Sequence, residues 1–266
     1  MKRLPLSHFL RRPVITGFFL FAALFVLTQS LTYQRYLLLK ETRQRELTNQ
    51  TNRTKERLQA VINYSYSTTK TLAFLVENYG IPSDFEHVAQ QLLKVNPTID
   101  MVELVKGGVI THVYPLKGNE GVIGFNILLD SARNSGAITT IEKRDFFVAG
   151  PIHLKQGGIG FVSRVPYYIN NQFQGFSAAV IKLSTLLNEA RIDTSGHGRF
   201  SYQLAKINAA TGKEEFFLQQ STSFRNDFFV TVDIPNGEWK LYVSDVSNTG
   251  YTALFIFAFL GFLLSI

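Results

Sequence analysis

The sequence contains no cysteine among its 266 residues, so disulfides, thiolate catalysis and zinc–cysteine sites are excluded. Charge is absent from two long stretches, residues 13–34 and 246–266, which hold 22 and 21 residues. About 20 apolar residues in a helix cross the hydrocarbon core of a bilayer. Each stretch is therefore long enough to span a membrane, and a purely cytosolic globular protein is excluded.

The sequence also lacks the residue spacings of a metal or nucleotide site. Its five histidines are dispersed, and none forms an H-x-x-x-H or H-E-x-x-H pair. The glycine-rich segment at residues 157–160 is not followed by the G-K-[ST] sequence that completes a P-loop. We therefore expect no metal and no cofactor, and a simple turn at this segment.

The distribution of charge narrows the set of partners. The formal net charge is +7, but the excess comes from four basic residues before residue 13 and a net +4 over residues 35–57. Residues 58–245 contain 16 basic and 17 acidic residues, so the region expected to fold is close to neutral. A neutral domain lacks the basic surface that binds DNA or RNA, so we expect no nucleic-acid partner.

The two uncharged stretches predict a membrane topology. Four cations precede the first stretch and no A-x-A-like cleavage site follows it, so we interpret it as an uncleaved anchor. The positive-inside rule places residues 1–12 in the cytoplasm, before a first transmembrane helix at 13–34. The second stretch has Leu, Ile and Phe on all sides, which predicts a transmembrane helix at 248–266. The expected location is the inner (plasma) membrane, multi-pass, with the residues between the spans in the periplasm or outside the cell.

The chain ends inside the second stretch, at Ile266. Terminal carbonyls and a carboxylate are costly in hydrocarbon. We therefore expect the sequence to be a fragment, in which the second transmembrane helix is truncated and a cytoplasmic part follows.

Residues 35–80 are expected to form a helical stalk continuous with the first span, because they contain no Pro, and no Gly before Gly80. From Leu58 to Tyr79, apolar or small residues recur at helical spacing, and such a stripe needs a partner surface. That surface belongs to the folded domain or to a second copy of the chain. A homodimer through the stalk is the expected assembly.

Residues 81–195 are expected to form a membrane-distal unit of helices and strands. A short helix capped by Ser83 or Asp84 leads into hairpins that turn at residues 106–108 and 170–171. Further helices are predicted at residues 128–135 and 184–191. Strands are predicted at residues 99–105, 109–114, 145–148, 159–165, 167–169 and 176–183.

Residues 196–247 change to strands alone and are expected to form a smaller, membrane-proximal unit. Its strands are predicted at residues 200–207, 215–220, 228–234 and 239–245. The expected fold class is therefore α+β, with a long N-terminal helix, two antiparallel sheet units and a second transmembrane helix.

One motif has a catalytic interpretation. Ser67 and Lys70 have the S-x-x-K spacing of penicillin-recognising enzymes. The K-T-G triplet that those enzymes carry on a facing strand does not occur in the sequence. The motif also lies on the polar stalk, so we expect no enzyme activity in this chain.

Three stretches resemble the CHASE domain, an extracytoplasmic sensor of histidine kinases and nucleotide cyclases. They are VITHVYPLKGNEGVIGFNIL from Val109, FFVAGPIHLKQGGIGFVSRVPYY from Phe146 and QGFSAAVIKLSTLL from Gln174, in the family's order and spacing. The resemblance implies two tandem PAS-like units on a long helix, with a small ligand in the distal unit. In the plant members that ligand is a cytokinin, an adenine derivative.

The resemblance also implies which residues line the pocket. Small residues on facing strands leave room for a planar or short ligand. Arg164 alternates with them and either faces solvent or, if it points inward, favours an anionic ligand. Asp130 and Asp145 are weak candidates for the acidic residue that holds adenine in the plant domains. The expected pocket residues are Val148, Ala149, Gly150, Pro151, Phe161, Ser163, Val165, Gly175, Ser177 and Ala178, with Arg164.

Two classes of function remain open. The first is a receptor that binds a small molecule outside the membrane and signals to a cytoplasmic output domain of the histidine kinase or diguanylate cyclase type. The second is a membrane-anchored structural or scaffolding module without a ligand, in which side chains such as Phe161 and Phe176 fill the cavity. An enclosed or clefted distal cavity would favour the receptor.

Overall fold

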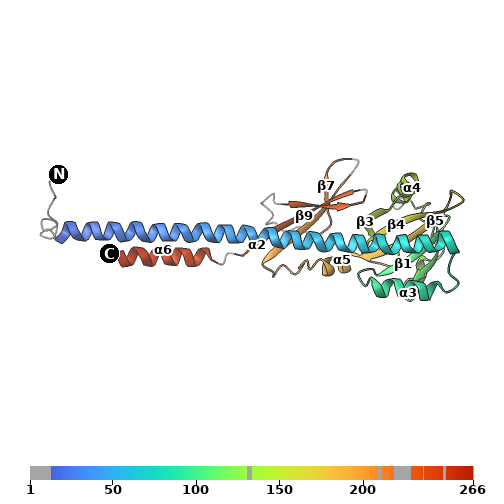
Figure 1. The fold of residues 1–266 in the computed structure, drawn as a ribbon, viewed down its shortest axis with the longest axis horizontal. Helices are drawn as coiled ribbons and strands as arrows, with labels where there is room; N and C mark the ends of the chain where they lie inside the picture. The colour runs from blue at the N-terminus through green and yellow to red at the C-terminus, as the bar shows by residue number, and fades with distance from the viewer. Residues whose placement is uncertain are drawn as a thin grey trace. The chain divides into compact units, whose positions relative to one another are not determined.

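A computed structural model describes residues 13–130, 134–208, 211–218, 229–235, 237–247 and 250–265 (Figure 1). The expected cytoplasmic segment, residues 1–12, lies outside this set. The chain divides into two compact units. One contains the residues up to Asn49 and those from Asp245 onward, and the other contains Gln50–Ser244.

The first described element is the 67-residue helix α2, Pro13–Tyr79. It joins the first uncharged stretch and the expected stalk in one uninterrupted helix, as the absence of Pro and Gly from residues 35–79 indicated. The buried residues of its second half follow helical spacing, as at Leu58, Ile62, Ser65 and Leu72. This stripe is the one that the sequence pattern located, and it packs on the sheet of its own chain.

Residues 50–244 contain a five-stranded sheet in the order β2-β1-β5-β4-β3. Its neighbouring strands pair antiparallel throughout. A hairpin turn at Asn170-Asn171, both with positive φ, joins the two long central strands. The strands are β1 (Met101–Lys106), β2 (Val109–Tyr114), β3 (Phe147–His153), β4 (Ile159–Ile169) and β5 (Gln172–Lys182).

Helices cover both faces of this sheet. The second half of α2 lies on one face, where the Ser177 hydroxyl donates to the Thr69 carbonyl at 2.6 Å. Helix α3 (Phe85–Val95), capped by the Asp84 side chain, lies against β1 and β2. Helix α4 (Asn134–Lys143) and the loop after β2, with its short helix η1 (Glu120–Val122), cover the other face. Helix α5 (Leu183–Glu189) follows β5 directly.

A second, four-stranded sheet has the order β7-β6-β9-β8. Its strands are β6 (Phe200–Ile207), β7 (Glu214–Phe216), β8 (Phe229–Ile234) and β9 (Gly237–Asp245). It packs on the first sheet through aromatic rings: the Phe161 ring lies 4.7 Å from Trp239 and 5.7 Å from Phe217, between ring centroids. The α+β class with two antiparallel sheets is thus confirmed.

The other unit pairs the first half of α2 with the C-terminal helix α6 (Tyr251–Ser265). Phe25 meets Phe262 and Tyr36 meets Tyr251, each pair 6.2 Å apart between ring centroids. Residue numbers fall along α2 as they rise along α6, so the two helices run antiparallel. Among the described residues, α2 alone is long and apolar enough to cross a membrane, and the apolar part of α6, Tyr251–Leu263, is shorter.

One helix and one strand around the first sheet differ from the sequence prediction. The helix expected at residues 128–135 corresponds to α4, which begins only at Asn134. Leu128 is part of a turn instead, because its N–H donates to the Asn126 side chain at 3.0 Å. The strand expected at 145–148 is β3, which runs through Gly150-Pro151 to His153. Pro is tolerated there because β3 is an edge strand with a bulge between Ala149 and Ile152.

Smaller differences affect three other strands. The strands expected at 159–165 and 167–169 form one strand, β4, which includes Pro166. Pro166 lies beyond the part of β4 that pairs with β3, so its missing N–H interrupts no ladder on that side. Strand β7 ends at Phe216, and the expected residues 219–220 lie outside the described residues.

Candidate functional site

The face of the first sheet that looks away from α2 carries two buried charges, Glu103 and Arg164. The sheet register aligns Glu103 with Ala178, and Ala178 with Arg164, on three neighbouring strands. Cross-strand partners share a face, so the carboxyl and the guanidinium flank the small side chain of Ala178. Their relative exposures are 6% and 3%.

Burial changes the acid–base properties of Glu103. Removal from water raises its pKa to about 7, and the positive charge of Arg164 opposes part of that rise. A carboxyl group with this pKa changes its charge near neutral pH. Perturbed groups of this kind are concentrated at functional sites, although structural ion pairs also produce them.

Glu103 and Arg164 lie on the floor of a small cavity. Its volume is about 30 Å³, and its wall combines the sheet with the loop after β2 and the β3–β4 turn. A water molecule needs roughly 10–15 Å³ of such volume, so the space holds about two waters. Lys155 and Gln156 of the turn lie over it, with Lys155 Nζ 4.9 Å from the Phe125 ring and Gln156 Nε2 donating to Met101 Sδ at 3.2 Å.

A larger cleft of about 250 Å³ lies between the two sheets. Arg164 and Ile152 line both this cleft and the small cavity, so the two spaces meet at these side chains. The first sheet contributes the edge strand β3, and the second contributes side chains that include Trp239 and Glu238. The cleft therefore combines aromatic walls with charged groups, as small-molecule sites do.

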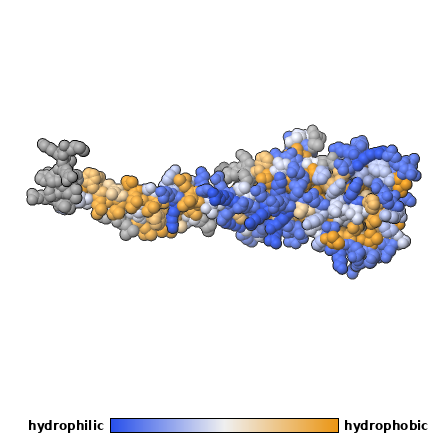
Figure 2. Space-filling model, viewed as in Figure 1, coloured by the Kyte–Doolittle hydropathy of each residue, from blue (hydrophilic) through white to orange (hydrophobic). Residues whose placement is uncertain are grey.

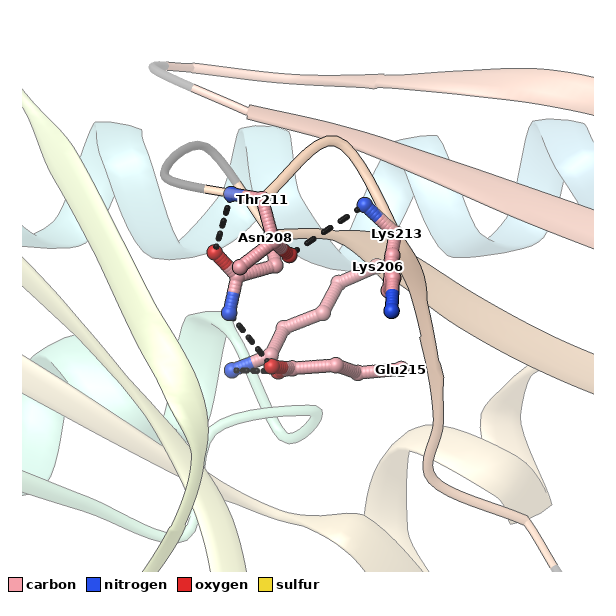
Figure 3. Close-up of polar contacts among 5 residues, drawn as sticks. All are labelled: Lys206, Asn208, Thr211, Lys213 and Glu215. Atoms are coloured by element: carbon pink, nitrogen blue, oxygen red, sulfur yellow. Dashed lines mark hydrogen bonds and ion pairs between the residues drawn. The ribbon is translucent and has the colours of Figure 1, made fainter.

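The β6–β7 hairpin fixes the charged rim of the cleft (Figure 3). Lys206 lines the cleft, and its Nζ forms an ion pair with Glu215 Oε2 at 3.1 Å. The Asn208 amide donates to Glu215 Oε1 at 2.6 Å, and the Thr211 N–H donates to Asn208 Oδ1 at 3.2 Å. The hydrogen bonds from Asn208 and Lys206 lower the pKa of Glu215. Lys206 is thus held in place by a partner on the neighbouring strand.

Four of the expected pocket residues line the inter-sheet cleft: Val148, Ala149, Gly150 and Arg164. Gly150 has φ +135 at the β3 bulge, and a Cβ there would lie 2.8 Å from the Phe161 ring. Only glycine adopts this φ without strain, so the bulge depends on this residue. Pro151 follows it within the same bulge.

Other expected pocket residues lie on the opposite face, against α2. The Ser163 hydroxyl donates to the Ser65 hydroxyl, and Ser177 donates to the Thr69 backbone. Val165 pairs with Ser177 and shares that face. Phe161 packs between the sheets, and Gly175 is packed so closely that a Cβ would clash with the Val105 carbonyl.

The sequence leaves the orientation of Arg164 open. Alternation along the strand places Ser163 toward the pocket and lets Arg164 face either solvent or the pocket. The structure buries Arg164 in the cavity wall and turns Ser163 toward α2. Both faces of β4 are covered, so alternation alone could not identify the cavity face.

Sequence reasoning missed Glu103, Lys206, Glu238 and Trp239. Glu103 carried a usable signal, because it is a single charge inside the apolar stretch MVELV, and a buried charge needs a partner or a function. The three residues of the second sheet carried none, since the sequence does not show which strands of two sheets approach each other.

The remaining candidates contribute nothing to this site. Asp145 Oδ1 accepts a hydrogen bond from the Phe146 N–H at 2.7 Å, next to its own backbone. Asp130 lies before α4, where its carbonyl accepts from the Asn134 N–H at 2.8 Å. Ser67 and Lys70 are both exposed on α2. No group of three or more His, Asp or Glu suited to a metal occurs among the described residues.

Solved structures of sensor domains share this fold. The extracellular ligand-binding receptor of Desulfohalobium retbaense matches with a TM-score of 0.57 and 13% identity over 74% of this chain, which covers 40% of that receptor chain. The ligand-binding domain of the Pseudomonas aeruginosa chemoreceptor PctC, solved with GABA, matches with a TM-score of 0.56 and 14% sequence identity. The match covers 74% of this chain and 96% of the PctC domain. The ligand-binding domain of the Pseudomonas fluorescens chemoreceptor CtaA, solved with L-serine, matches with a TM-score of 0.58 and 12% sequence identity. The match covers 77% of this chain and 98% of the CtaA domain.

Sequence comparison points to the same class of domain. No curated protein matches the chain. The family model described as the CHASE domain matches residues 82–217, just over half of the sequence. That range contains the whole first sheet and the charged face that carries Glu103 and Arg164. The chain belongs to the CHASE domain family of extracellular sensor domains.

Proposed function

We propose that this chain is the sensory part of a multi-pass receptor in the inner (plasma) membrane, and that it binds a small molecule on the charged face of its first sheet. The observation that carries the proposal is the burial of both Glu103 and Arg164 on that face, on either side of Ala178. Burying a carboxyl and a guanidinium is costly, and a ligand that bonds to both recovers part of that cost.

The charges of this pair define a ligand class. A guanidinium binds a carboxylate through two parallel N–H···O bonds, and a buried carboxylate binds an ammonium. A small zwitterion such as an amino acid presents both groups. The related sensor domains PctC and CtaA were solved with GABA and L-serine, which supports testing this class first.

An amino acid needs more room than the small cavity offers. The β3–β4 turn closes that cavity through Lys155 and Gln156, whose side chains contact the Phe125 ring and the Met101 sulfur, both weak interactions. We therefore infer that the turn moves outward when the ligand enters. The residues Val148, Ala149 and Gly150 of β3 and the neighbouring Pro151 are proposed to follow that movement, because the turn continues β3 directly.

The expected membrane topology completes the proposed receptor. Residues 13–34 and 248–266 are proposed to span the bilayer on either side of the sensor, after a cytoplasmic segment at 1–12. Residues 35–80, 81–195 and 196–247 are proposed as the stalk, the distal PAS-like unit and the proximal PAS-like unit. A homodimer through the stalk and an output domain of the histidine kinase or diguanylate cyclase type complete this proposal.

Thermal unfolding of the detergent-solubilised chain in the presence of single amino acids tests the ligand class. We expect L-serine, GABA or another amino acid to raise the Tm of the unmodified chain at millimolar concentration. Glu103→Gln and Arg164→Gln should lose that rise. Glu86→Gln removes an exposed carboxylate from α3 and should keep it. No rise with any of the twenty amino acids or GABA would contradict this ligand class.

A module without a ligand is the second candidate, and the size of the small cavity favours it. Phe176 is fully buried on the cavity face, its ring centroid 4.9 Å from that of Phe173. These rings fill part of the space that a ligand would occupy. A broad metabolite library that never changes the Tm of the chain would favour this scaffolding function over the receptor.

A further inference from the structure

We propose that the groove between α2 and α6 binds the headgroup of an anionic phospholipid. The groove has a volume of about 350 Å³ and lies within the unit formed by these two helices. Its α2 wall contains Arg35, Leu38 and Thr42, and the opposite wall contains Gly250, just before α6, and Leu254 of α6. A cation, a hydroxyl and apolar side chains thus share one recess, which suits a phosphate joined to acyl chains.

The cations of this region are directed toward α6. The Arg35 guanidinium lies 5.5 Å from the centre of the Phe257 ring, and that of Arg43 lies 4.4 Å from the centre of the Tyr251 ring. These ring contacts hold both positive charges on the side of α2 that faces the groove. Arg45, by contrast, is paired with Glu41 at 2.6 Å, and both side chains are largely exposed.

The surrounding sequence supports an anionic partner. Residues 35–57 contain seven basic and three acidic residues, directly after a stretch of 22 residues without charge. Basic residues beside a membrane span attract the headgroups of anionic lipids. Tyr33 and Tyr36 flank Arg35 in the sequence, and the Tyr36 ring contacts that of Tyr251. Aromatic side chains at the end of a membrane span are typical of the interface between lipid and water.

The apolar surface of α2 on the N-terminal side of the groove extends the proposed lipid site. Leu31 and Leu27 are exposed on α2, one and two helical turns before Arg35, and they lie on the same face of the helix. Figure 2 shows hydrophobic residues over the apolar part of these helices and hydrophilic residues where the charged stretch begins. An acyl chain along this surface places its phosphate beside Arg35. The guanidinium and the Thr42 hydroxyl then donate to the phosphate oxygens, and Arg43 adds a second positive charge.

Lipid retention by the full chain tests the proposal. The chain is reconstituted in vesicles of equal parts phosphatidylglycerol and phosphatidylcholine, extracted in mild detergent and analysed by native mass spectrometry. We expect retained phosphatidylglycerol to exceed phosphatidylcholine severalfold. Arg35→Gln should lower that ratio toward one, and the combination with Arg43→Gln should lower it at least as far, because each change removes a positive charge that favours the anionic headgroup.

Arg45→Gln is the matched control, because it removes the same charge two residues from Arg43 but outside the groove. It should retain phosphatidylglycerol like the unmodified chain. Equal retention of the two lipids, or an equal loss in Arg45→Gln and Arg35→Gln, would overturn the site. Displacement of the lipid by inorganic phosphate at the same concentration would also overturn it, in favour of a free-anion site.

The inference depends on both helices lying in a bilayer and not on the ligand of the first sheet. Circular dichroism of each variant checks that α2 and α6 remain folded, so that lost retention reports the groove. If the chain binds an amino acid but retains no phosphatidylglycerol, the lipid site is disproved and the amino-acid ligand class is not. A chain that retains the lipid but responds to no amino acid disproves only the ligand class.

Discussion

The Ser163 hydroxyl donates to the Ser65 hydroxyl across 2.8 Å, and this bond joins the centre of the first sheet to the long helix α2. Ser65 in turn donates to the Ile62 carbonyl at 2.7 Å, and both serines are fully buried. One turn further along α2, Ser177 donates to the Thr69 carbonyl. The helix therefore contacts the first sheet through small polar groups, and the hydroxyls of Ser65, Ser163 and Ser177 each have a hydrogen-bond partner.

The first prediction concerns this contact. Ser163→Ala should lower the free energy of unfolding by about 1 kcal/mol, because the Ser65 oxygen loses its buried donor. Urea unfolding followed by the fluorescence of Trp239, the only tryptophan, measures the change. Ser65→Ala and the double variant complete a double-mutant cycle. A coupling energy near zero would mean that the two hydroxyls do not interact.

The second prediction is a pH dependence caused by Glu103. Its pKa is about 7 in the folded chain against 4.5 in the unfolded one, so the folded state binds more protons between these values. The contribution of Glu103 to stability is therefore greatest below pH 4.5 and falls by about 3 kcal/mol in total as the pH rises through 7. Glu103→Gln cannot titrate, so the difference in stability between it and the unmodified chain should grow between pH 5 and pH 8 by about that amount. A constant difference between pH 5 and pH 8 would contradict the raised pKa.

The third prediction concerns the β3 bulge. Gly150→Ala should destabilise the chain by roughly 2 kcal/mol or more, because φ is +135 and the new Cβ meets the Phe161 ring at 2.8 Å and the Gly160 carbonyl at 2.9 Å. Gly158→Ala is the matched control, since its φ is also positive but nothing lies within 4 Å of the new Cβ. It should cost about 1 kcal/mol. Thermal unfolding compares the two, and equal losses would mean that crowding at Gly150 is unimportant.

The fourth prediction tests the pairing of α2 with α6. A Cβ on Gly261 would lie 2.9 Å from the Thr28 Cβ, which is near the separation of 3.5–4.5 Å in disulfides. Thr28→Cys combined with Gly261→Cys should therefore crosslink on mild oxidation. The chain has no cysteine of its own, so a mobility shift on non-reducing gels is unambiguous. Thr28→Cys with Leu254→Cys, two helical turns away on α6, should stay uncrosslinked, and crosslinking of both pairs alike would contradict the antiparallel register.

Several elements were predictable from local sequence because their causes are local. The uninterrupted helix α2 follows from the absence of Pro and internal Gly over residues 35–79, and the Asp84 cap of α3 from a side chain next to the helix start. The hairpin at Asn170-Asn171 follows from two residues that tolerate positive φ. Helix α4 was misplaced because Asn126 and the residues after it form a turn that competes with the helix.

The sequence by itself determined the two uncharged stretches, the long helix, the α+β class and the CHASE motifs, since each depends on composition or on neighbours in the chain. Only the tertiary structure decided which side of β4 faces the cavity, because α2 covers one face of the first sheet and the loop and α4 cover the other. It also brought Glu103 to Arg164 across Ala178, and Lys206 and Trp239 to β3. These residues are far apart in sequence, and their contacts depend on strand order and sheet packing, which local patterns do not encode.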